Sequence, residues 1–555
     1  MPMPSLRRLA VVGLASHAAC TSIKYTTPPA ASVICNEHSY TYQGLAGYGS
    51  LPSDARDQYG DTISFGSSMA IKNWTRTGNK YKGTMYGLPD RGWNTNGTQN
   101  TIPRVHVFEL SLTETEATVS KPSGPNVEFK YQRTILLHGP DGKPMTGLDP
   151  DFTGGLTYPG FPTMPAATYP GDGFGGPGPG DKRISLDAEG LVVEEDGSFW
   201  ISDEYGPFLY RFDEKGRMTA AIQPPDALLP IRNGNVSFNS NTPPIYDSSL
   251  VPSPEDPDHG RQNNQGFEGL TISADGKTLW AMLQSAAEQD GGASSSKRRN
   301  TRLLKYALRR TDKKKTKNKK KGGDVEVTYE AEYAVPLPTY ENSKGKTRVA
   351  AQSEIHYVSD SQLLVLARDS DAGRGRDDPL SRYRHVDIVD ISGATNIAGP
   401  RFDDVRNGNI TVGGTSDPSD DLVDGITPAK LCPFIDYNLN SELNKFRTAE
   451  GDLVHNGEPV NLGLLNEKWE ALALVPVIPD TKGKGKDEGG TCGGKRDGDE
   501  YYLFTLSDND FITNNGYADF GKIHYVDDSA TVPFLNSQAL VFRITLPRGS
   551  KPLIS

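Results

Sequence analysis

A short pattern that recurs along the chain limits its fold more than any other feature of the sequence. Residues 186–218 read LDAEGLVVEEDGSFWISDEYGPFLYRFDEKGRM, where a Glu-Gly-Leu step opens an apolar run and an Asp-Gly turn leads into an aromatic run. Residues 264–283 read NQGFEGLTISADGKTLWAML, with nearly the same order. Apolar runs of strand length that are separated by Asp-Gly turns predict antiparallel hairpins. We therefore expect a chain built from repeated β units.

Further copies of this unit extend over most of the sequence. Repeats of about 40–50 residues with four strands each are typical of a β-propeller. Two β-sandwiches or a β-helix are the alternatives, but hairpins that each lead into a strand of the form xxYxL or xxFxI favour propeller blades. The expected fold is all-β, a β-propeller of four-stranded antiparallel blades. The clearest copies lie at 67–92, 186–218, 267–308, 352–392 and 468–547.

The number of blades is estimated from these copies. Five are clear, and the stretch YQRTILLHGPDGKP, which starts at Tyr131, either belongs to the first unit or makes another. We expect six or seven blades, with ALVFRIT at 539–545 closing the ring beside an N-terminal strand, because closure removes exposed sheet edges. Long loop insertions separate the units, and loops tolerate added residues at small entropic cost. These insertions are 224–265, 288–300, 310–323, 395–466 and 481–498.

Charge is unevenly distributed along the chain. The 555 residues include 59 Lys and Arg against 70 Asp and Glu, for a net charge of −11. Residues 296–321 hold 14 of the basic residues and one acid, so the remainder is more acidic than the average. An acidic body disfavours nucleic acid as a partner and suits hard cations. The basic run at 310–323 is interpreted as a solvated hairpin tip that is dispensable for folding.

The N-terminus, MPMPSLRRLAVVGLASHAACTS, has the order of a secretory signal. Arg7 and Arg8 precede a short apolar run, and small residues follow with a cleavage point near Ala18 or Ala19. A disordered cytosolic N-terminus is the alternative, but four N-glycosylation sequons favour secretion: Asn73, Asn96, Asn235 and Asn409. We expect a signal peptide at 1–19, an N-terminal extension at 20–45 and the propeller domain at 46–555. The protein is then extracellular and monomeric, with no membrane span, since the apolar run is too short to cross a bilayer.

The four cysteines predict disulfides rather than zinc binding. Cys20, Cys35, Cys432 and Cys492 form no Cys-x-x-Cys motif. An even number of cysteines in a secreted chain indicates one or two disulfides. The preferred pair is Cys432 with Cys492, because both flank inserted loops near one blade. Cys20 is either removed with the signal or paired with Cys35.

Acidic residues recur at one place in each hairpin. The first strand starts at the edge where the second strand ends, so Glu189 is expected beside Asp203 and Glu204. The other units repeat this arrangement. Glu268 is expected near Gln284, Glu354 near Arg368 and Asp369, and Glu470 near Asp508, Asn509 and Asp510, while Asp90 and Arg91 take the matching place in the first unit.

One glutamate per blade at the same edge of the innermost strands would make a ring of oxygens around the axis. Such carboxylates repel one another unless they are protonated or neutralised. Ca²⁺, which takes about six to eight oxygen ligands, would neutralise them. The alternative is that each glutamate accepts backbone N–H groups and fixes a turn. The expected metal ligands are Glu189, Asp203, Glu204, Glu268, Glu354, Asp369 and Glu470. The expected catalytic residues are Glu189, Glu268, Arg91 and Arg368, of which the arginines would hold an anionic substrate.

Several motifs occur in an order that resembles the phytase-like family, also described as esterase-like activity of phytase. They are DRG at 90–92, DAEGL and WISDEYGP in the unit at 186–218, GFEGLTIS, LLVLARD, and KWEALAL with YYLFTLSDNDF. The resemblance covers most of residues 66–547. It implies a secreted or periplasmic β-propeller related to calcium-dependent propeller phosphatases and lactonases. This chain departs from the family pattern with Ser-Glu-Ile at Glu354 and Trp-Glu-Ala-Leu at Glu470.

Other catalytic motifs are missing from the sequence. It contains no Gly-x-Ser-x-Gly elbow, His-Glu-x-x-His motif or P-loop. Two hypotheses therefore stand side by side. The first is a secreted Ca²⁺-dependent hydrolase of phosphoesters or esters, in which the ion polarises the scissile group and activates water at a carboxylate–arginine cluster in the channel mouth. The second is a non-catalytic extracellular propeller that binds a glycan, a protein or a small anion.

Overall fold

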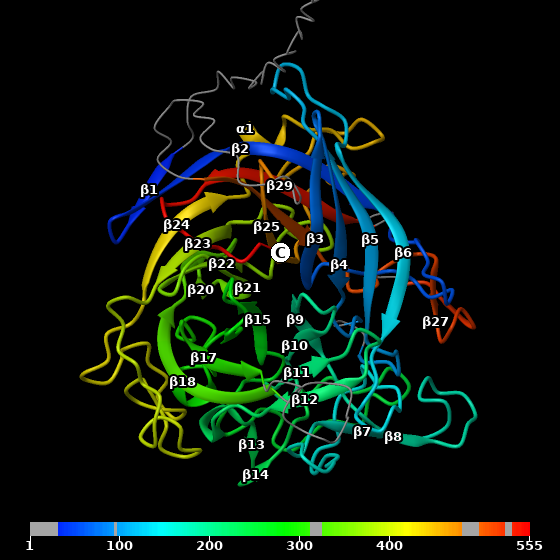
Figure 1. Cartoon of the computed structure of the whole chain (residues 1–555). Coiled ribbons are helices and arrows are strands. Elements are labelled where there is room, and N and C mark those ends of the chain that lie inside the picture. The colour runs from blue at the N-terminus through cyan, green and yellow to red at the C-terminus, as the bar shows by residue number, and fades with distance from the viewer. Residues whose placement is uncertain (1–30, 94–96, 311–324, 480–498, 528–534, 555) are drawn as a thin grey trace, which may run out of the picture.

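Five antiparallel sheets of four or five strands are arranged radially about a common axis (Figure 1). The computed structural model describes residues 31–93, 97–310, 325–479, 499–527 and 535–554. The innermost strands of the sheets, β3, β9, β15, β21 and β25, contact one another in a closed ring. The predicted all-β propeller of four-stranded antiparallel blades is therefore confirmed. The predicted number of six or seven blades is wrong, because the described residues form five.

Four of the blades follow one another along the chain, each running from its inner to its outer strand. Blade one contains β3 (Ser68–Thr77), β4 (Lys80–Leu88), β5 (Arg104–Thr113) and β6 (Val127–Leu136). Blade two contains β9 (Ala188–Val193), β10 (Phe199–Asp203), β11 (Leu209–Phe212) and β12 (Met218–Ile222). Blade three contains β15 (Phe267–Ile272), β16 (Thr278–Leu283), β17 (Asn300–Arg310) and β18 (Val325–Pro336). Blade four contains β21 (Ala351–Tyr357), β22 (Gln362–Arg368), β23 (Arg384–Asp390) and β24 (Lys430–Asp436).

The stretch around Tyr131 explains the difference in blade number. It forms β6, which pairs with β5 as the outer strand of blade one. It is therefore the fourth strand of the first unit and not the start of another blade. The inserted segments likewise add short hairpins and turns rather than a further blade.

The fifth blade closes the ring by joining both ends of the domain. Its sheet order is β25 (Trp469–Pro476), β26 (Glu500–Ser507), β29 (Ser537–Thr545), β2 (His38–Leu51) and β1 (Ser32–Cys35). The closure predicted for ALVFRIT beside an N-terminal strand is confirmed, since Leu540 pairs with Tyr48 in the antiparallel β2–β29 ladder. The boundary expected at residue 46 falls inside β2, so residues 38–45 are part of this blade.

The hydrophobic core is divided among the interfaces between neighbouring blades. A large cluster lies between each pair, such as the one between blades two and three that contains Trp200 and Phe267. Every residue of β9, β15 and β21 is buried. A strand that is packed on both faces carries apolar residues at consecutive positions, as Leu191, Val192 and Val193 do in β9. Full burial of a large apolar side chain stabilises the fold by about 1.5–3 kcal/mol.

The insertions contribute small elements outside the blades. They include the hairpins β7 (Ala166–Tyr169) with β8 (Asp181–Ile184), β13 (Ile231–Arg232) with β14 (Asn235–Val236), β19 (Thr339–Glu341) with β20 (Thr347–Val349), and β27 (Gly516–Ala518) with β28 (Ile523–Tyr525). The helical turns are η1 (Asp226–Leu228), η2 (Glu288–Asp290) and α1 (Asn440–Leu443). No helix in the described ranges is both long and apolar enough to cross a membrane. The basic segment 311–324 lies outside the described residues.

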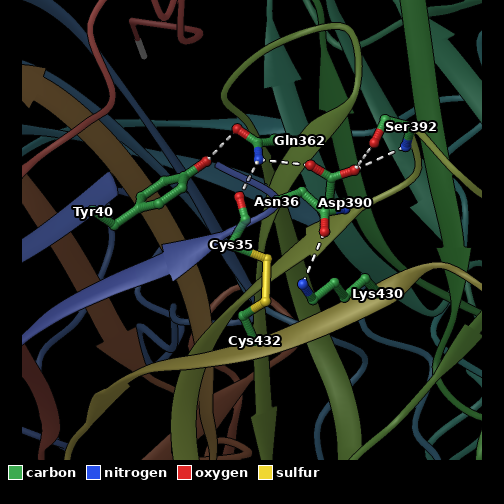
Figure 2. Close-up of a disulfide and its surroundings, with 8 residues drawn as sticks. All are labelled: Cys35, Asn36, Tyr40, Gln362, Asp390, Ser392, Lys430 and Cys432. Atoms are coloured by element: carbon green, nitrogen blue, oxygen red, sulfur yellow. Dashed lines mark hydrogen bonds between the residues drawn. A yellow bond between two sulfur atoms is a disulfide. The ribbon is translucent and has the colours of Figure 1, made fainter. Parts of the chain in front are cut away.

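A disulfide joins the outermost strands of blades four and five. Cys35 in β1 is bonded to Cys432 in β24, with their Cα atoms 6.0 Å apart (Figure 2). The expected Cys432–Cys492 pair is therefore wrong, and so is the alternative of Cys35 with Cys20. Ring closure brings β1 against β24, and this neighbour is set by the fold and not by distance along the chain. Cys20 and Cys492 lie outside the described residues.

Polar contacts surround this disulfide and bind the same two blades together. The Tyr40 hydroxyl donates to Gln362 Oε1 at 2.8 Å, and Gln362 Nε2 donates to Asp390 Oδ2 at 2.7 Å (Figure 2). Lys430 Nζ donates to the Asn36 side chain at 2.8 Å. The last blade is thus attached to the fourth by covalent and hydrogen bonds, in addition to its apolar packing.

Candidate functional site

Three of the predicted glutamates occupy equivalent places on the inner strands, at the face of the propeller where these strands begin. Glu189 in β9, Glu268 in β15 and Glu470 in β25 each lie in a β-bulge next to the first residue pair of the strand. All three are at least 95% buried. The pKa of Glu189 is raised well above its ordinary value, by burial first and then by the neighbouring charge of Glu268. Burial, followed by the charge of Glu470, likewise raises the pKa of Glu268 well above its ordinary value.

Glu354 does not take the equivalent place in β21. The bulge residue there is Ser353, and Glu354 pairs with Leu366 one residue further along the strand. Its Oε1 accepts the backbone N–H groups of Leu270 at 3.0 Å and Ile355 at 2.9 Å, and its Oε2 accepts the Ser68 hydroxyl. Glu354 therefore links inner strands of blades one, three and four, as the backbone-capping alternative expects.

The sequence carried a signal for this difference. Glu189 and Glu268 are each followed by glycine, whereas Ser-Glu-Ile places Glu354 at the glycine position of the unit. A Cβ atom on Gly190 would lie 2.4 Å from the Cβ of Leu270, since the next inner strand approaches closely here. Packing against the next blade thus requires glycine after Glu189, whereas blade five has alanine at the equivalent place. The one-residue shift in blade four moves the Glu354 side chain to a different set of partners.

A first carboxylate group is formed by Asp187, Glu189 and Glu204. One oxygen from each side chain lies within 4.8 Å of the other two, and all three residues are buried. Glu204 Oε1, and Oε2 of the nearby Glu268, have no hydrogen-bond partner among the described residues. Burial first and the charge of Glu268 second raise the pKa of Glu204 well above its ordinary value. Asp187 was missed by the sequence analysis, although it stands two residues before Glu189 in the repeated motif.

Arg91 lies against this first group. Its Nη1 forms an ion pair with Asp187 Oδ2 at 3.2 Å, and its backbone N–H donates to Asp187 Oδ1 at 3.2 Å. Its Nη2 donates to Asn264 Oδ1 at 2.5 Å, and the guanidinium carbon is 5.1 Å from the centre of the Tyr205 ring. Asn264 was not predicted, and it comes from the loop that precedes β15. Arg91 is thus positioned by three segments beside the carboxylates.

Arg368 is engaged by carboxylates from blade five and the loop before it. Its Nη1 pairs with Glu467 and its Nη2 with Glu470, and its side chain is 7% exposed. Burial, the largest single effect, lowers the pKa of Arg368, but the charges of Glu467 and Glu470 outweigh it, so that the pKa is raised above its ordinary value. This arginine neutralises Glu470 within the structure, so the carboxylates of blade five have a protein cation as their partner.

Two further predicted metal ligands use their oxygens to hold loops. Asp203 accepts the backbone N–H groups of Asp187, Tyr205 and Gly206, each at 3.1 Å. Asp369 accepts the Ser381 hydroxyl at 2.8 Å and the Arg382 backbone N–H at 2.6 Å. Asp203 thus positions the loops that carry Asp187 and Glu204, and Asp369 positions the loop that follows Arg368.

A second carboxylate group consists of Asp90, Asp508 and Asp510. Its oxygens also lie within 4.8 Å of one another, and the residues come from the loop after β4 and the loop after β26. Lys468 Nζ lies among them, 2.8 Å from Asp90 Oδ2 and 2.6 Å from Asp510 Oδ1. The sequence analysis expected Asp508 and Asp510 near Glu470 but gave no role to Lys468.

The donor set of the first group fits a calcium ion. Ca²⁺ binds oxygens at about 2.3–2.6 Å, so two oxygens on one ion are separated by at most about 5 Å. The three oxygens of Asp187, Glu189 and Glu204 satisfy this limit. A buried carboxylate oxygen without a partner is costly unless a cation or a proton compensates it. By contrast, the histidine rings that hydrogen-bond in the described residues do so with Thr134, Asn461 or backbone carbonyls, and none joins this group.

The fold and this acidic centre define a five-bladed propeller with buried carboxylates at one end of its axis. The chain belongs to the phytase-like family, described as esterase-like activity of phytase, whose model matches residues 77–422. An uncharacterized secreted protein of Arthroderma benhamiae is 48% identical over 497 residues, which cover 87% of this chain and 89% of that protein. The extracellular localisation that the sequence predicted is confirmed by this secreted relative.

Two solved structures show a distant likeness to this chain. The Drosophila Plexin A chain in complex with Semaphorin 1b is 8% identical with a TM-score of 0.17, and the alignment covers 60% of this chain and 61% of that one. A catalytically inactive virginiamycin B lyase from Staphylococcus aureus with quinupristin is 10% identical with a TM-score of 0.16, over 58% of this chain and 95% of that one. Likeness at these TM-scores carries no argument about function.

Proposed function

We propose that this protein is a secreted, calcium-dependent hydrolase of phosphoester or ester substrates. The observation that carries the proposal is the convergence of Asp187, Glu189 and Glu204, whose buried oxygens lie within 4.8 Å of one another. Such a set suits a hard divalent cation. When bound, the ion would polarise the oxygen of the scissile group and lower the pKa of water. Membership of a family described by esterase-like activity supports the same class of reaction.

The residues of the chain would divide the work as follows. Asp187, Glu189 and Glu204 would hold the cation, while Asp203 fixes the two loops that carry Asp187 and Glu204. Glu268, whose Oε2 has no hydrogen-bond partner among the described residues, accepts a proton from water. Its other oxygen accepts a hydrogen bond from Gln284, which orients the carboxyl group. Arg91 fixes Asp187 and adds positive charge beside the position of an anionic substrate.

A second candidate function is favoured by a specific observation. Arg91 and Arg368 both form ion pairs with carboxylates of the chain, to Asp187 and to Glu467 and Glu470. Arginines that are engaged in this way act as structural cations, which favours a non-catalytic propeller that binds a glycan, a protein or a small anion. The two hypotheses predict the same fold, but only the first predicts that the protein hydrolyses a substrate.

The decisive experiment combines metal analysis with an activity panel on the purified full-length protein. We expect bound calcium, and hydrolysis of aryl phosphates or aryl esters that a chelator abolishes and calcium restores. Glu189→Gln should lose both metal and turnover, while Glu341→Gln, on the exposed hairpin strand β19, should keep both. Bound calcium without turnover would support the non-catalytic propeller, and an absence of bound calcium would rule out the metal centre.

A further inference from the structure

The ammonium group of Lys468 lies inside the second carboxylate group. Lys468 directly precedes β25, and its side chain is 12% exposed. Its Nζ is 2.8 Å from Asp90 Oδ2 and 2.6 Å from Asp510 Oδ1, both within hydrogen-bond distance, and 3.6 Å from Glu470 Oε2. A buried lysine is charged only where nearby carboxylates offset its loss of hydration. Carboxylates from two different loops supply this compensation.

The carboxylates around Lys468 are held by the backbone and by other side chains. The Gly92 backbone N–H donates to Asp90 Oδ1 at 2.7 Å, and the Ser64 hydroxyl donates to Asp508 Oδ1 at 2.5 Å. Asp508 Oδ2 is buried and has no hydrogen-bond partner among the described residues. The positions of these oxygens therefore do not depend on Lys468 alone, and the second group contains a buried oxygen that has no hydrogen-bond partner among the described residues.

The two carboxylate groups are alike in composition but differ in the cation that offsets their negative charge. Each has three buried acidic residues whose oxygens lie within 4.8 Å of one another. They are adjacent in space, since Asp90 directly precedes Arg91, whose backbone N–H donates to Asp187 Oδ1 of the first group at 3.2 Å. Arg91 reaches the first group through Asp187, whereas Lys468 contacts two of the three carboxylates of the second group directly.

We propose that the two groups form a paired cation centre, in which the ammonium of Lys468 is the permanent second cation. Two-metal hydrolases use a pair of adjacent cations to stabilise charge on a substrate. Here the second position holds a point charge that is part of the chain and needs no metal. The proposal rests on the proposed function only for the cation of the first group, because the role of Lys468 in the second group stands on its own contacts.

The proposal predicts that removal of the ammonium creates a metal site. In Lys468→Met the side chain keeps a similar length and loses its charge, which leaves three buried carboxylates without their cation. A hard divalent ion suits such a set. We therefore expect the full-length variant to bind one calcium ion per chain more than the wild type, measured by equilibrium dialysis with elemental analysis. Lys468→Arg should show no gain, because it retains the positive charge.

Lys522→Met is the matched control. Its side chain is 67% exposed and pairs with Asp519 at the surface, so its replacement should leave the calcium content unchanged. The wild-type calcium content tests the proposed function, and the increment in Lys468→Met tests this inference, so the two can fail separately. A folded Lys468→Met with the wild-type calcium content overturns the inference. A variant that neither folds nor binds the ion in millimolar calcium also overturns it, because calcium then fails to replace the ammonium.

Discussion

The Glu354 carboxylate accepts the backbone N–H of Leu270 at 3.0 Å and so joins the inner strands of blades four and three. A further bond from the Ser68 hydroxyl connects the same carboxylate to blade one. Ser68 Oγ in turn accepts the backbone N–H of Leu191 in blade two at 2.9 Å. A single side chain thus contributes to the cohesion of four blades at the propeller axis.

This position makes the stability of the protein depend on pH. Burial raises the pKa of Glu354 from its ordinary value of 4.5 to about 8, in spite of its three hydrogen-bond donors. The folded state therefore binds this proton more tightly than the unfolded chain. The stabilisation is complete below pH 4.5 and is lost as the pH rises through about 8, at no more than about 1.4 kcal/mol per pH unit.

We expect Glu354→Gln, which resembles the protonated form, to remove this dependence. The difference in unfolding free energy between wild type and variant should change across the window from pH 4.5 to about 8, measured by denaturant titration of the calcium-free protein. Glu341→Gln is the control and should follow the wild type at every pH. Parallel profiles for wild type and Glu354→Gln would show that this carboxyl group does not titrate in the window.

The Cys35–Cys432 disulfide closes a loop of the chain with a sequence separation of 397 residues. We expect Cys432→Ala to lower the free energy of unfolding by about 2–4 kcal/mol, since the bond restricts the unfolded chain. Thermal denaturation with and without reductant measures this effect. Non-reducing peptide mass spectrometry should recover Cys35 linked to Cys432. Recovery of a Cys432–Cys492 peptide would contradict the assignment.

The close approach of β9 and β15 predicts a strong effect at Gly190. A Cβ there would lie 2.4 Å from Leu270 Cβ and 2.7 Å from the Glu268 carbonyl oxygen. We expect Gly190→Ala to destabilise the fold by about 1–3 kcal/mol, because backbone atoms must shift. Gly124→Ala is the control, since no atom lies within 4 Å of its added Cβ. Equal denaturation midpoints for the two variants would argue against close packing of these strands.

The sequons differ in how well they can carry a glycan in the folded protein. Asn73 and Asn235 are exposed, in β3 and β14. Asn409 is half-buried, and its amide donates to the Thr411 carbonyl at 2.8 Å. A glycan on the amide nitrogen is bulky and belongs on the surface. We expect glycans on Asn73 and Asn235 and none on Asn409 after secretion from a eukaryotic host, as glycopeptide mass spectrometry can measure. Occupancy at Asn409 alone would contradict this expectation.

Local sequence was sufficient to predict the blades because each hairpin is encoded within one stretch of chain. The Asp-Gly turns and apolar runs of 186–218 specify β9 to β11. The same pattern of turns and apolar runs specifies β15 and β16. The closing pair of β29 and β2 was also predictable, since an open propeller would leave two exposed sheet edges. The shared edge of each hairpin likewise placed Glu189 and Glu204 at one face of the propeller.

Contacts between blades were not encoded in any one stretch, and only the tertiary structure decided them. The number of blades depended on whether the strand that contains Tyr131 belongs to the first sheet. The disulfide partner of Cys432 depended on which strand lies beside β24. A shift of one residue relative to the bulge gave Glu354 backbone partners instead of a place beside Glu268. The ammonium of Lys468 entered the second carboxylate group because ring closure brings the loops after β4 and β26 together. Turns and hydrogen bonds between neighbouring strands determine the structure of each blade. Packing and ion pairing between segments that are far apart in the sequence determine which groups the carboxylates contact.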